Sequence, residues 1–102
     1  MNTVRYYPEV RPPLTVIAAG NIARVRREKG WSQERLSRAC HLSRETIRAV
    51  EQAKDGVHGF RLYTLEIIGD ALGVNPVELL RYDAETTRAY LQRLSSLSLV
   101  TS

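Results

Sequence analysis

The feature that most constrains this chain is a helix-start signal that occurs three times. Each copy has a Ser or Asn that can cap a helix. One apolar residue comes directly before this cap and another comes four positions after it, which is the spacing of a hydrophobic staple. The three caps, each with its apolar pair, are Ser32 (Trp31 and Leu36), Ser43 (Leu42 and Ile47) and Asn75 (Val74 and Leu79). After Asn75, Pro76 and Glu78 add a first-turn proline and a capping box. The sequence therefore predicts an all-α fold.

Apolar residues at helical spacing extend this prediction along the chain. A first helix is expected from about residue 15 to a stop at Gly30, and a fourth helix ends at Gly73. The residues predicted to face inward after the first helix are Leu36, Ala39, Cys40, Ile47, Val50, Leu65, Ile68, Ala71 and Leu72. Residues 52–60, which contain two glycines, are predicted to form a loop.

The length of 102 residues is that of a single domain. We expect an extended N-terminal arm over residues 1–14, a helical domain over residues 15–81, and a C-terminal helix or tail over residues 82–102. Apolar residues recur in that last segment at Tyr90, Leu91, Leu94 and Leu97. This stripe either covers the core or forms a seam with a second copy.

The positive charge is concentrated in one third of the chain. Residues 21–54 hold nine basic and four acidic side chains, a surplus of five against a net charge of +4 for the whole chain. Arginine supplies 13 of the 15 basic residues, and its forked guanidinium suits phosphate and guanine. The pattern is that of a polyanion-binding surface or of a basic, solvated helical face.

Several classes of protein are not expected. One cysteine, Cys40, allows no internal disulfide and is expected to be a small core residue; with two distant histidines it makes no metal site. No apolar run is long enough for a membrane span, and the first residues lack the centre of a secretory signal. No nucleophile–base pair, carboxylate dyad or phosphate loop has usable spacing. We expect a cytoplasmic protein that is not an enzyme and uses no cofactor.

Residues 41–43 alone separate the helix that ends at Cys40 from the helix that begins at Arg44. So short a link sets two helices at a steep angle and projects the second from the body. The small Ser37 is predicted where these helices approach most closely. A helix projected in this way fits a DNA major groove, so the pattern indicates a helix-turn-helix.

In these segments the sequence resembles the lambda repressor/Cro-like family, also called the XRE type. The resemblance spans about residues 22–80 and is carried by Gly30-Trp31-Ser32-Gln33-Glu34-Arg35-Leu36, Leu42-Ser43-Arg44-Glu45-Thr46-Ile47, Val50-Glu51 and Ala71-Leu72-Gly73-Val74. It implies a five-helix domain that binds specific double-stranded DNA, usually as a homodimer, in bacterial or phage transcription regulators. One departure is His41, at a turn position that favours a left-handed backbone.

The resemblance also implies roles for individual residues. The family's base-reading positions are occupied by Arg44, Glu45, Arg48 and Ala49. Gln33 matches a residue that touches a phosphate and braces the recognition helix, and Arg26 and Glu51 match an internal salt bridge.

Side-chain chemistry leaves alternatives open at several of these positions. Arg44 and Arg48 either contact DNA, where they can fork to guanine, or lie on a solvated surface. Glu45 either accepts a hydrogen bond from cytosine or holds one of these arginines in place. Further candidates for phosphate contacts are Ser43, Thr46, Gln52, Lys54 and Arg61. Arg5 and Arg11 on the arm either enter a minor groove or pack on their own domain.

The leading hypothesis is a repressor of phage, prophage or bacterial origin that occupies an operator with inverted-repeat half-sites. It would act in the cytoplasm, at the nucleoid. A second hypothesis is the antitoxin of a toxin–antitoxin pair, whose C-terminal tail binds the toxin; an antirepressor is another protein partner to consider. A third is a protein-interaction module that does not read DNA.

Overall fold

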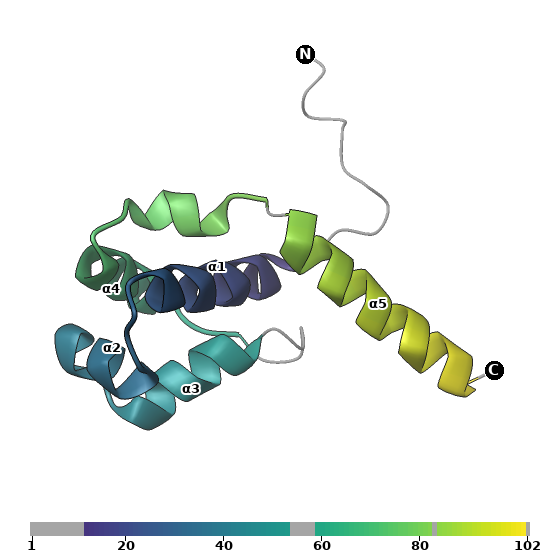
Figure 1. Ribbon diagram of the computed structural model, residues 1–102, viewed down its shortest axis with the longest axis horizontal. Coiled ribbons are helices and arrows are strands. Elements are labelled where there is room, and N and C mark those ends of the chain that lie inside the picture. The colour runs from purple at the N-terminus through teal and green to yellow at the C-terminus, as the bar shows by residue number, and fades with distance from the viewer. Residues whose placement is uncertain (1–11, 54–58, 83, 102) are drawn as a thin grey trace, which may run out of the picture.

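The structure is a computed structural model that describes residues 12–53, 59–82 and 84–101, and this part of the chain contains helices and no strand (Figure 1). The elements in chain order are α1 (Leu14–Glu28), α2 (Gln33–Cys40), α3 (Arg44–Gln52), α4 (Leu62–Leu72), the 3-10 helix η3 (Pro76–Leu80) and α5 (Ala84–Thr101). The all-α fold is confirmed, and the helix after Asn75 proves to be of the 3-10 type. A segment of five residues is short enough for the tighter i→i+3 bonding.

All three predicted caps are present. The hydroxyls of Ser32 and Ser43 each accept a hydrogen bond at 3.0 Å from the backbone N–H three residues later. Asn75 Oδ1 accepts from the N–H of Val77, also at 3.0 Å. The predicted capping box does not form among the described residues, because the Asn75 side chain accepts from Val77 and not from Glu78, and the Glu78 carboxylate pairs with Arg81 at 3.2 Å. The helix starts are therefore set by local chemistry, as the sequence indicated.

The corner between α2 and α3 depends on a left-handed residue. His41 has φ 57° and ψ 36°, and its N–H donates to carbonyls in the last turn of α2. The N–H of Leu42 donates to the carbonyl of Ser37 at 3.0 Å, which completes a Schellman-type end. This turn reverses the chain within three residues, so α3 begins beside α2.

One apolar core joins the first four α-helices and η3. Its buried residues are Ala18, Ile22, Leu36, Cys40, Ile47, Val50, Leu65, Ile68, Leu72 and Leu79. Burial raises the pKa of the Cys40 thiol, which keeps it neutral in the core. The prediction for Ala39 is wrong, since it is exposed. The inward face of α2 is centred on Leu36, Ser37 and Cys40, and Ala39 lies about 100° around the helix from that centre.

Asn21, in the middle of α1, holds the chain that leads to α5. It is 1% exposed, and its Nδ2 donates to the carbonyls of Leu79 at 2.8 Å and Arg81 at 3.0 Å. Its Oδ1 accepts from Arg24 at 3.2 Å. The buried amide thus has partners on both its oxygen and its nitrogen, and it fixes the path of the chain after η3.

Helix α5 begins against α1 and then runs obliquely away from the other helices (Figure 1). Thr87 is buried and Tyr90 is half-buried, whereas Leu91 is exposed. The side chains of Leu94 and Leu97 lie outside the described part, as do residues 1–11 of the predicted arm. The first turns of α5 therefore cover part of α1. None of the described helices combines the length and apolar character needed to span a membrane.

Gly69 is the point of closest approach between α4 and η3. A Cβ placed there would lie 2.9 Å from the Cα of Pro76, a backbone atom that cannot move without shifting η3. The N–H of Val74 also donates to the Gly69 carbonyl at 3.0 Å. Absence of a side chain at this position is therefore required by the packing.

We expect Gly69→Ala to lower the free energy of unfolding by about 1–2 kcal/mol. Alanine favours the helix by about 1 kcal/mol, but crowding a packed contact costs up to about 3 kcal/mol. Thermal unfolding followed by circular dichroism measures the change. The matched control is Gly59→Ala, whose new Cβ would lie an ordinary 3.6 Å from Thr15 and which should leave stability unchanged. A variant at Gly69 that is more stable than wild type would contradict this account.

Candidate nucleic-acid interface

Helix α3 has one buried side and one exposed side. Ile47, Val50 and Glu51 are buried, at 0%, 2% and 8% exposure. The exposed residues are Arg44, Glu45, Arg48, Ala49 and Gln52. All four positions predicted to read bases therefore lie on the surface of one helix. We call these five exposed residues the α3 face.

The charged groups of the α3 face are exposed. Within the described part of the chain, Arg44, Glu45 and Arg48 take part in no ion pair. The structure thus contains no contact by which Glu45 holds either arginine in place. Two guanidinium groups and one carboxylate are exposed together for contact with another molecule.

The N-terminal end of α3 carries two linked hydroxyls. Ser43 Oγ lies 2.8 Å from Thr46 Oγ1 and also accepts the Thr46 N–H at 3.0 Å. Ser43 is exposed and Thr46 is half-buried. A hydroxyl can both donate and accept, so this pair can take a further partner at the positive end of the helix dipole.

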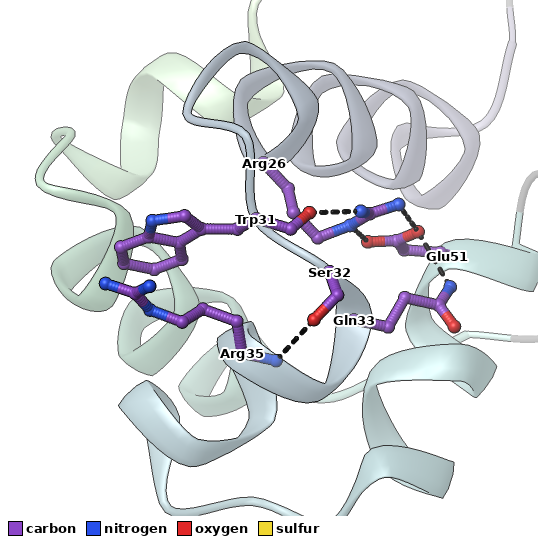
Figure 2. A network of polar contacts seen from close by, with 6 residues as sticks. All are labelled: Arg26, Trp31, Ser32, Gln33, Arg35 and Glu51. Atoms are coloured by element: carbon purple, nitrogen blue, oxygen red, sulfur yellow. Dashed lines mark hydrogen bonds and ion pairs between the residues drawn. The ribbon is translucent and has the colours of Figure 1, made fainter.

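A buried ion pair joins α1 to the C-terminal half of α3 (Figure 2). Arg26 Nε and Nη2 donate to Glu51 Oε2 and Oε1 at 2.7 Å and 3.0 Å. The two side chains are 9% and 8% exposed. The third nitrogen of the Arg26 guanidinium, Nη1, donates to the Trp31 carbonyl at 2.7 Å. This bidentate geometry fixes both the distance and the orientation between the two helices.

Gln33 extends the ion pair to the start of α2. Its Nε2 donates to Glu51 Oε1 at 3.0 Å (Figure 2), so the Glu51 carboxylate accepts three side-chain hydrogen bonds from α1 and α2. Gln33 is half-buried. The amide thus braces α3 against α2, which is one of the two roles expected for it.

Trp31 has a contact that its place before the Ser32 cap did not predict. The guanidinium of Arg35 lies 4.9 Å from the centre of its ring, and the Lys29 amine lies 5.4 Å from it. Figure 2 shows the Arg35 side chain alongside the indole. Cation–π attraction holds both positive groups at the turn before α2, close to the ion pair.

The other predicted phosphate contacts lie at the ends of helices or outside the described residues. Gln52 is the last residue of α3, and Arg61 is exposed at the N-cap of α4. Lys54, in residues 54–58, lies outside the described residues. Arg5 and Arg11, in residues 1–11, also lie outside them. The structure therefore brings together Ser43, Thr46, Gln33 and the α3 face.

Comparison with known proteins agrees with this geometry. A family model described as a helix-turn-helix domain matches residues 18–82, and the chain belongs to that family. The chain is similar to a Neisseria hypothetical transcription factor from Neisseria meningitidis serogroup B, with 39% identity over 67 residues. That match covers 66% of this chain and 60% of the relative, so the chain spans somewhat less than two thirds of the relative's length.

The fold is also similar to a solved structure. The crystal structure of the hypothetical transcription factor NHTF from Neisseria superposes with a TM-score of 0.63 and 33% identity. The superposition covers 78% of this chain and 93% of that one. The predicted helix-turn-helix family is confirmed.

The buried ion pair should dominate the stability of the interface. We expect Glu51→Ala to lower the free energy of unfolding by about 3–5 kcal/mol, because it leaves the Arg26 guanidinium buried without its partner. Urea unfolding followed by circular dichroism measures this. The matched control is Glu28→Ala, which breaks the exposed Arg24–Glu28 pair and should cost less than about 1 kcal/mol. Equal effects of the two substitutions would disprove a special role for the buried pair.

Proposed function

We propose that this chain is a sequence-specific DNA-binding transcription regulator that inserts α3 into the major groove. The observation that carries the proposal is the α3 face, whose charged groups form no ion pair within the described residues. The buried pair of Arg26 and Glu51 fixes the helix that bears them. Membership of the helix-turn-helix family supports it, as do the relatives described as transcription factors. Residues 15–81 form the DNA-binding unit in this proposal.

The α3 face offers a different chemistry for each kind of base edge. Arg44 and Arg48 can each fork to O6 and N7 of guanine, and Glu45 can accept from N4 of cytosine. The methyl of Ala49 suits the thymine methyl. Each good pair discriminates by about 1–3 kcal/mol, so two or three of them give useful selectivity.

Contacts to phosphate would set the register of α3 along the duplex. The proposed phosphate-binding residues are Gln33, Ser43, Thr46, Gln52, Lys54 and Arg61. Ser43 and Thr46 stand at the N-terminus of α3 and Gln33 stands at the N-terminus of α2, where the helix dipoles favour anions. In this arrangement Gln33 binds a phosphate while it braces Glu51.

A homodimer would place two α3 helices on an inverted repeat with half-sites about one helical turn apart. Such a dimer would act as a repressor by occupying its operator, in the cytoplasm of a bacterium or of a phage-infected cell. In this proposal the exposed Leu91 in the C-terminal segment 82–102 contributes to the contact between copies or to a protein partner.

Selection of bound sites from random duplexes tests the proposal. We expect enrichment of an inverted repeat, because two symmetric recognition helices read the same half-site twice. Enrichment of one half-site alone would point to a monomer. No enrichment, together with binding to a protein partner that salt does not weaken, would support the interaction-module alternative and overturn the proposal.

Substitution of the α3 arginines tests the base contacts. Arg44→Ala and Arg48→Ala should each weaken binding to the selected site by about 10- to 100-fold, the loss of one base pair's discrimination, and weaken binding to random DNA much less. Fluorescence anisotropy with both duplexes measures the ratio. The control is Arg81→Ala, which removes an arginine that pairs with Glu78 outside α3. Equal losses on both duplexes would refute a base-reading role.

A further inference from the structure

A cleft of about 740 Å³ lies beside the C-terminal half of α3, between α1, α3 and the first turns of α5. Arg48 and Gln52 line it from α3, and Gln33 lines it from the start of α2. Its wall on α1 includes Arg27, and its wall on α5 includes Glu85. Neither Arg27 nor Glu85 belongs to the positions predicted to contact DNA.

Three of the six charged residues that line the cleft are paired within the protein. Arg24 pairs with Glu28 at 3.3 Å, and Glu51 is held by Arg26. Within the described residues, Arg27, Arg48 and Glu85 form no ion pair. The cleft therefore presents two available cations from α1 and α3, and one available anion from α5.

The side of the cleft on α1 carries small residues, so a bulky ligand can approach the backbone of this helix. These small residues are Ala19, Gly20 and Ala23, and Ala89 stands on the α5 side. The cleft is also continuous with the α3 face, because Arg48 and Gln52 belong to both. A molecule that lies along the α3 face can therefore also contact the cleft, through Arg48 and Gln52.

The geometry points to this cleft as a second site for the sugar–phosphate backbone of DNA, with Arg27 as a phosphate-binding residue contributed by α1. The inference rests on the proposed function, since it assumes that α3 lies in a major groove. A duplex fits both the α3 face and the cleft, because one chain of phosphates can contact Arg48, Gln33 and Arg27, which all line the cleft. The contact would be independent of base sequence.

Glu85 has the opposite effect in this arrangement. Its carboxylate stands across the cleft from the available arginines and repels a phosphate placed between them. Helix α5 would thus lower the affinity for DNA of any sequence. The base contacts made by the α3 face would then supply a larger share of the binding free energy.

Two substitutions that remove a charge test the inference, and they are expected to change the affinity for DNA in opposite directions. Arg27→Gln should weaken binding to the selected site and to random DNA by the same factor, roughly tenfold at 0.1 M salt, and should reduce the slope of log affinity against log salt by about 0.9. Glu85→Gln should strengthen binding to both duplexes several-fold. Both residues are exposed, and thermal unfolding checks that each variant folds.

Matched controls carry the same chemical changes elsewhere. Arg81→Gln and Glu66→Gln alter exposed side chains that do not line the cleft and should leave affinity and salt slope near those of wild type. If wild type selects a site but Arg27→Gln and Glu85→Gln behave like the controls, the cleft does not bind DNA and the proposed function stands. If wild type binds no DNA, both proposals fail.

Discussion

The interface depends on the buried contact between Arg26 and Glu51. A charge taken out of water is costly unless a partner with good geometry compensates it, so these two side chains must meet in one arrangement only. Because Arg26 belongs to α1 and Glu51 to α3, that arrangement fixes the recognition helix relative to the body. Gln33 adds the start of α2 to the same carboxylate. Three helices thus share one polar anchor behind the surface proposed to meet DNA.

The charged residues of α3 have two different roles, and burial decides which role each one has. Glu51 is compensated inside the protein, whereas Arg44, Glu45 and Arg48 are exposed and make no ion pair within the described part of the chain. The exposed groups can keep their water until a ligand displaces it. The same division occurs on α1, where Arg26 is buried and its neighbour Arg27 is exposed. One helical position therefore separates a residue that holds the fold from a residue that can bind a partner.

What could be predicted from the sequence was local. The caps at Ser32 and Ser43, the left-handed His41 and the short turn act within a few residues, and the apolar period reports the core face directly. Asn21 was missed because its partners lie 58 and 60 residues away. The packing role of Gly69 was missed because it is Pro76, in another element, that a side chain there would crowd. The cleft was missed because the placement of α5 against α1 creates it, and no pattern within α5 specifies that placement.

The chain contains a single tryptophan, and the fold places it at the turn before α2, half-buried and near two cationic side chains. Its carbonyl is held by the same arginine that anchors α3. Indole emission responds to nearby charge and to water. The protein thus carries an intrinsic optical probe at its helical corner, and a rearrangement of that corner can be followed in unlabelled material.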